Sequence, residues 1–86
     1  MERRTIPIDQ IEAVFDRIHT HLELKMIKHG PGAFVSNHEA FGAITEEYYE
    51  LLDELRNNDT DAFCVESLDL IVAILWGILS SYERSI

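Results

Sequence analysis

The sequence predicts an all-α protein, a single domain over residues 1–86 built as a bundle of about three helices. Two observations predict this fold class. Apolar residues recur at helical spacing in three segments, and no segment keeps the apolar–polar alternation that is typical of a strand. A Gly-Pro-Gly turn at residues 30–32 and an Asn-Asn-Asp turn at residues 57–59 separate the three segments.

The first helix is predicted over residues 9–28. Asp9 and Glu12 have the spacing of an N-cap residue and its partner in the first turn. A stripe at helical spacing then gives the helix one apolar face. The stripe consists of Ile11, Val14, Phe15, Ile18, Leu22 and Met26.

The second helix is predicted over residues 36–56, because Ser36 and Glu39 have the form of a capping box. On a helical wheel its apolar residues fall in one arc, with Glu47 at the edge of that arc and Glu50 and Glu54 just beyond it. The apolar residues are Phe41, Ile44, Tyr48, Leu51, Leu52 and Leu55.

The third helix is predicted to begin near residues 59–61, where acidic groups suit the positive end of a helix, and to continue to about Tyr82. After Asp69 it is apolar on nearly all sides, which indicates burial on several faces. We expect such burial at the centre of a homo-oligomeric bundle.

Size and composition also favour self-association. A chain of 86 residues is near the length at which one core is marginal, yet 47% of its residues are hydrophobic. A second copy would bury faces that a monomer leaves wet. We therefore expect a homodimer or a homotetramer.

The formal net charge of −9 argues against binding to nucleic acid or to an anionic membrane. A phosphate-bearing ligand would have to arrive with a metal ion that neutralises both partners. Cys64 is the only cysteine, so an intramolecular disulfide is excluded. The longest apolar run, residues 70–79, is too short to span a bilayer, and no export signal is recognised. These observations favour a soluble cytoplasmic protein.

Two pairs of carboxylates point to metal chemistry. Glu47 and Glu50 lie three apart on one predicted helix, and Glu66 and Asp69 lie three apart on the next. Residues at this spacing share a helix face, so two packed helices would bring four carboxylates together. Such a cluster suits Mg²⁺, with Mn²⁺ as a substitute. The alternative for Glu47 and Glu50 is a solvated helix face.

Asp69 is harder to explain as a surface residue, since it stands between Leu68 and Leu70. Buried there, its carboxylate would need a cation, a hydrogen-bond donor or a metal. The histidines offer no metal set of their own, because no two share helical i, i+3 or i, i+4 spacing. They are His19, His21, His29 and His38.

The carboxylate pairs carry a resemblance to a known family. Glu46-Glu47-x-x-Glu50 followed by Glu66-x-x-Asp69 resembles the E-E-x-x-E and E-x-x-D motifs of the MazG-like nucleoside triphosphate pyrophosphohydrolases, an all-α superfamily. The likeness covers about residues 25–80. It implies Mg²⁺-dependent hydrolysis of a nucleoside triphosphate between the α and β phosphates, giving the monophosphate and pyrophosphate. House-cleaning of non-canonical nucleotides would fit the family.

The resemblance also implies roles for individual residues. The metal ligands would be Glu47, Glu50, Glu66 and Asp69. The catalytic carboxylates would be Glu46, Glu47, Glu50 and Glu54, with Glu46 or Glu54 as a candidate to orient or deprotonate the attacking water.

Other residues would contact the substrate. The family often carries a basic segment after its last motif helix, whereas here Arg84 is the only late cation, so Lys25, Lys28 or a partner subunit would supply phosphate contacts. Trp76 either stacks on a nucleobase or belongs to the core. Two rival functions stay open: a phosphoribosyl-ATP pyrophosphohydrolase, and a non-catalytic helical interaction module that retains the fold.

Overall fold

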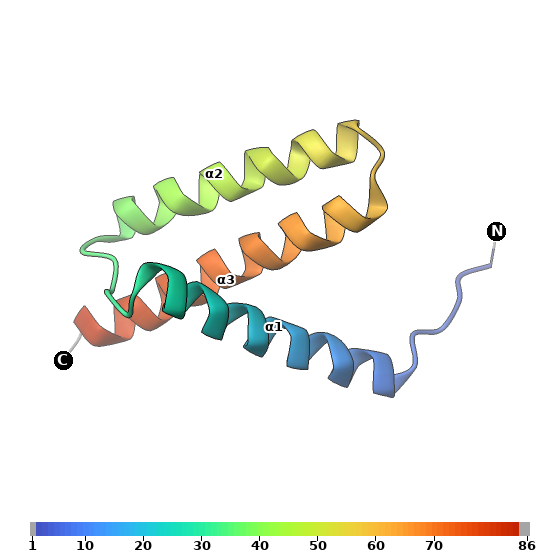
Figure 1. The fold of residues 1–86 in the computed structure, drawn as a ribbon, viewed down its shortest axis with the longest axis horizontal. Coiled ribbons are helices and arrows are strands. Elements are labelled where there is room, and N and C mark those ends of the chain that lie inside the picture. The colour runs from blue at the N-terminus through green and yellow to red at the C-terminus, as the bar shows by residue number, and fades with distance from the viewer. Residues whose placement is uncertain (1, 85–86) are drawn as a thin grey trace.

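The computed structural model describes residues 2–84, and in that range it contains three α-helices and no strand (Figure 1). The helices are α1 (Ile8–His29), α2 (Asn37–Arg56) and α3 (Thr60–Arg84). The predicted all-α class and three-helix content are therefore confirmed. Each predicted boundary lies within about two residues of the observed one, which is the usual uncertainty of helix ends.

Helices α2 and α3 form an antiparallel hairpin and lie side by side along its length (Figure 1). The Ser36 hydroxyl accepts a hydrogen bond from the backbone N–H of Glu39 (3.1 Å), so Ser36 caps α2 as predicted. At the turn before α3, the Asp59 carboxylate accepts a hydrogen bond from the backbone N–H of Ala62 (3.0 Å). Local side chains thus accept hydrogen bonds from the first turns of both hairpin helices.

The start of α1 differs from its prediction. The N-cap residue is Pro7, in an extended conformation, and Asp9 lies inside the first turn instead of capping it. The Asp9 carboxylate accepts a hydrogen bond from the neighbouring backbone N–H of Gln10 (3.1 Å). The prediction was wrong because Pro7 fixes an extended residue directly before Ile8, where the helix begins.

Helix α1 crosses α3 obliquely and, over the part of the chain that the structure describes, does not pack against α2 (Figure 1). The connection from α1 to α2 is tied to the C-terminal end of α3. The backbone N–H of Phe34 donates to the buried Ser80 hydroxyl (2.9 Å), and Arg84 donates to the Phe34 carbonyl (2.7 Å) and to the Asn37 side chain. These bonds hold the C-terminal half of α1 over α3.

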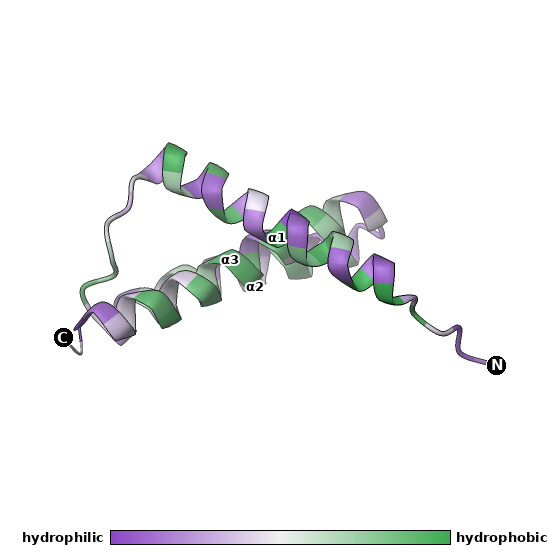
Figure 2. Ribbon diagram, turned by 90° about the horizontal axis from the view of Figure 1, so that it is seen from below, coloured by the Kyte–Doolittle hydropathy of each residue, from purple (hydrophilic) through white to green (hydrophobic). Residues whose placement is uncertain are grey.

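The core of the single chain is small. Among residues 2–84, its buried apolar side chains are Ala40 of α2 and Leu68 and Val72 of α3. Much apolar surface stays exposed along α3 and on α1 (Figure 2). The large exposed residues include Ile11, Val14, Phe15, Ile27, Phe41, Leu55, Val65, Ile74, Ile78 and Leu79.

Helix α3 is also the one helix of residues 2–84 that is long and apolar enough to cross a membrane, judged by length and composition alone. The sequence predicts that the apolar run at residues 70–79 is too short to span a bilayer. The helix that contains this run has 25 residues. Only 11% of its most apolar window is buried within this chain. Most of this apolar window is therefore not fully buried within the single chain.

Candidate metal centre

The hairpin brings carboxylates from two helices together. Glu47 of α2 and Glu66 and Asp69 of α3 each offer an oxygen, and these oxygens lie within 4.8 Å of one another. The antiparallel packing of α2 on α3 makes this possible, because it sets the middle of α2 beside the first half of α3. Three of the four predicted metal ligands thus meet in one cluster, which we call the carboxylate cluster.

Glu50, the fourth predicted ligand, is exposed and borders the cluster. Its carboxyl approaches those of Glu47 and Glu66. Burial, followed by the charge of Glu50 and a hydrogen bond with it, raises the pKa of Glu47 to about 7. Burial, followed by the charges of Asp69 and Glu50, also raises the pKa of Glu66. The neighbouring carboxyl groups thus disfavour the charged forms of Glu47 and Glu66.

Two oxygens of the cluster have no protein partner. Oε2 of Glu47 and Oε2 of Glu66 are buried, and neither has a hydrogen-bond partner among the residues that the structure describes. A buried acceptor without a donor costs about 1–3 kcal/mol, and more if it is charged. A hard divalent cation, which prefers carboxylate oxygens, would satisfy both atoms. The residues present therefore fit a Mg²⁺ or Mn²⁺ ion.

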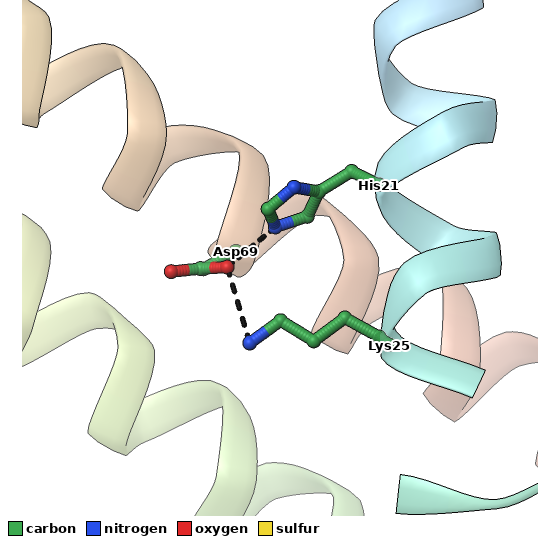
Figure 3. A network of polar contacts seen from close by, with 3 residues as sticks. All are labelled: His21, Lys25 and Asp69. Atoms are coloured by element: carbon green, nitrogen blue, oxygen red, sulfur yellow. Dashed lines mark hydrogen bonds and ion pairs between the residues drawn. The ribbon is translucent and has the colours of Figure 1, made fainter. Parts of the chain in front are cut away.

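Asp69 differs from the two glutamates because α1 supplies it with donors (Figure 3). His21 Nε2 lies 2.5 Å and Lys25 Nζ 3.3 Å from Oδ1 of Asp69. Burial acts to raise the pKa of Asp69, but the hydrogen bonds and charges of His21 and Lys25 outweigh it and lower that pKa. The expectation that Asp69 needs a cation or a donor is confirmed.

His21 is a site residue that the sequence reasoning missed. The spacing among the four histidines predicts no metal set, and it gives no reason to pair His21 with an aspartate on another helix. The usable signal was the spacing of His21 and Lys25, which are four apart and so share one face of α1. Two hydrogen-bond donors on one face of α1, together with a lone aspartate in the apolar α3, would have indicated the contact with Asp69.

A cleft of about 240 Å³ opens beside the carboxylate cluster. Glu47, Asp69 and Lys25 line one part of it, and Trp76 lines another, with its indole N–H donating to the Gly32 carbonyl (2.9 Å). The remaining walls are mostly apolar and come from all three helices and the α1–α2 connection. They include Leu22, Met26, His29, Gly30, Phe34, Ala43, Val72 and Ala73.

Of the predicted substrate-binding residues, Lys25 and Trp76 line this cleft, whereas Lys28 is exposed and does not. Of the predicted catalytic carboxylates, Glu46 is exposed and stands outside the cluster. Glu54 lines a different depression, beside the turn at residues 57–59. The structure thus gathers Glu47, Glu50, Glu66, Asp69, Lys25 and Trp76, and leaves Glu46, Glu54 and Lys28 apart.

These features define a class of protein: a three-helix chain in which a carboxylate cluster with two buried, unpartnered oxygens adjoins a mostly apolar cleft. In comparisons with protein-family models, with curated proteins and with solved structures, nothing matches this chain. The functional interpretation therefore rests on the residues themselves and on their geometry.

Proposed function

We propose that this chain is a Mg²⁺-dependent pyrophosphohydrolase that converts a nucleoside triphosphate to the monophosphate and pyrophosphate. The observation that carries the proposal is the joining of the carboxylate cluster to a cleft that contains Lys25 and Trp76. A surface patch of acidic residues would explain neither the buried oxygens of Glu47 and Glu66 nor the adjoining cleft.

Glu47, Glu66 and Asp69 would hold the metal, with Glu50 at the exposed edge. When bound, the ion polarises phosphate oxygens, offsets charge in the transition state and lowers the pKa of a coordinated water. Because Glu46 and Glu54 stand outside the cluster, Glu50 is the carboxylate best placed to orient the attacking water.

The cleft would receive the rest of the nucleotide. Asp69 and Trp76 are seven residues apart on α3, a separation of about 10 Å along a helix, which suits a phosphate group at one end and a base at the other. The apolar walls near Trp76 suit a stacked nucleobase. The Lys25 ammonium lies at the Asp69 end, 3.3 Å from Oδ1 of Asp69, and would contact a phosphate there.

The proposal includes a cytoplasmic homo-oligomer. The three buried apolar side chains found among residues 2–84 form a small core, and exposed apolar side chains follow α1 and α3. A second copy of the chain is always present at the same concentration as the first. It is therefore a suitable partner to cover apolar surface on whose burial folding depends. Insertion of α3 into a bilayer is disfavoured because it would take Glu66 and Asp69 with it.

Two rival functions would use different parts of the same structure. A non-catalytic interaction module would use the exposed apolar surface and would have no use for the carboxylate cluster. A phosphoribosyl-ATP pyrophosphohydrolase would use the same metal and cleft with another substrate. Substrate choice and the response to metal separate these functions.

The test compares Glu66→Gln with Asp53→Asn, which removes an exposed charge from α2 outside the cluster. Pyrophosphate and monophosphate release is measured with Mg²⁺ on a panel of ribo- and deoxyribonucleoside triphosphates and on phosphoribosyl-ATP. We expect turnover that falls at least about 100-fold in Glu66→Gln and persists in Asp53→Asn, since metal sites supply several kcal/mol of transition-state stabilisation. Equal turnover in both variants would refute the site, and no turnover by the wild type would favour the interaction module.

A further inference from the structure

Two side chains of α1, which lies outside the carboxylate cluster, contact the same oxygen of Asp69. His21 and Lys25 both contact Oδ1, and the other carboxylate oxygen points away from both of them (Figure 3). The His21 and Asp69 side chains are largely buried, with 22% and 14% of their surfaces exposed. Helix α1 therefore occupies one oxygen of Asp69, and the other is turned to the side opposite α1.

We propose that His21 is a positioning residue: its Nε2–H holds Oδ1 of Asp69 so that the second oxygen is presented to the divalent cation. The inference rests on the proposed metal site, and it assigns to α1 a part in metal binding. His21 itself does not contact the ion.

The hydrogen bond has a defined direction. An ionised carboxylate only accepts hydrogen bonds, so the proton of this contact stands on Nε2 of His21. A ligand group that is itself hydrogen-bonded is fixed in orientation, and loss of such an outer partner typically weakens metal binding about 10–100-fold. The 2.5 Å contact from His21 to Asp69 has this form.

Lys25 is less suited to the positioning role. Its ammonium lies farther from Oδ1, at 3.3 Å, and its side chain is more exposed, at 32%. It ends a flexible stem that also lines the cleft, so it is free to turn to a phosphate. The imidazole has two side-chain torsions and contacts Asp69 alone among the carboxylates of the cluster. His21 is thus the fixed member of the pair.

The test uses two amides of different length at position 21. In His21→Gln the amide nitrogen reaches about as far as Nε2 and donates a hydrogen bond, whereas the shorter His21→Asn side chain does not reach Asp69. Both variants are polar, which keeps the helix surface similar. His19→Asn is the matched control, because His19 lies on the same helix with 74% of its side chain exposed and pairs with the exposed Glu23, away from the carboxylate cluster.

Mg²⁺ affinity is measured by isothermal titration calorimetry on the full chain, and helix content is checked by circular dichroism. We expect His21→Asn to weaken Mg²⁺ binding about 10–100-fold, with His21→Gln and His19→Asn close to the wild type. Equal affinity in the Asn and Gln variants would overturn the positioning role. Absence of Mg²⁺ binding by the wild type would instead overturn the metal site on which the inference rests.

Discussion

The carboxylate cluster contains groups whose pKa values move in opposite directions. The pKa of Glu47 is raised to about 7 and that of Glu66 is raised as well, whereas the pKa of Asp69 is lowered. Burial acts to raise the pKa of all three carboxyls, and neighbouring carboxylates raise those of Glu47 and Glu66 further. The pKa of Asp69 is lowered instead because α1 supplies it with His21 and Lys25 as donors. A divalent cation would complete the side of the cluster that α1 does not reach.

The raised pKa of Glu47 predicts how stability depends on pH without metal. The Glu47 carboxyl has a pKa of about 7 in the folded chain and 4.5 in the unfolded chain, so folding favours its protonated form. Its contribution to stability is therefore present below pH 4.5 and is lost as pH rises through 7. Urea unfolding in EDTA should show falling stability from pH 5 to pH 8. Glu47→Gln should flatten that fall, and Mg²⁺ should reverse it at pH 8. Unchanged stability across this range in the wild type would contradict the assignment.

Replacing Lys25 by methionine should change two measurements in opposite directions. The Lys25 ammonium lies beside Asp69 and repels an incoming cation, so Lys25→Met should bind Mg²⁺ several-fold more tightly when no nucleotide is present. The same change would remove the phosphate contact proposed for Lys25 and should raise KM for the Mg²⁺–nucleotide several-fold. Calorimetry and steady-state kinetics check the two parts, and a shift of both in the same direction would count against the role of Lys25.

At the scale of the elements, α2 and α3 approach closely where Ala40 faces Gly77. A Cβ added at Gly77 would lie 3.5 Å from the Ala40 Cβ and 3.9 Å from Cδ1 of Ile44, which is ordinary contact. Gly77→Ala should therefore stabilise the chain by up to about 1 kcal/mol through helix propensity. Gly42→Ala, with nothing near its added Cβ, is the control and should give a similar gain in urea unfolding. A loss of stability in Gly77→Ala alone would show that the two helices pack more tightly than described.

Helix limits were predictable where the signals are local. Ser36 and the turn at residues 57–59 mark the hairpin because capping and turn residues act within a few positions along the chain. The pairing of Glu47 with Glu66 and Asp69 followed from i, i+3 spacing once two helices were assumed to pack. The contact between His21 and Asp69 joins residues 48 apart and depends on the oblique crossing of α1 over α3. Periodicity within one helix carries no information about that angle.

At the scale of the whole molecule, a small core is combined with a large exposed apolar surface. Hydrophobic content predicted that surface, but composition does not say which faces meet, because that depends on the partner. Figure 2 shows apolar residues along α3, where Ile74 and Ile78 are among the exposed ones. The candidate site therefore lies within a single chain. We propose that association with further copies stabilises that chain.

We predict that the chain is a dimer or a tetramer in analytical ultracentrifugation. Ile78→Lys should shift it toward monomer, because 45% of this apolar side chain is exposed and a charge there opposes burial against a second copy. Gln10→Lys adds the same charge at an exposed polar position and should leave the assembly unchanged. A wild-type monomer at all concentrations, or flotation with lipid vesicles, would contradict the proposed association.

Hydrolysis of a nucleoside triphosphate with Mg²⁺ in water enriched in ¹⁸O tests the central claim most directly. Attack on the α-phosphorus should place the label in the nucleoside monophosphate and leave pyrophosphate unlabelled, as read by mass spectrometry. The wild type should give that result, and Glu66→Gln should give little of either product. Release of a nucleoside diphosphate with labelled phosphate, label in pyrophosphate, or no turnover on any nucleotide would contradict the account.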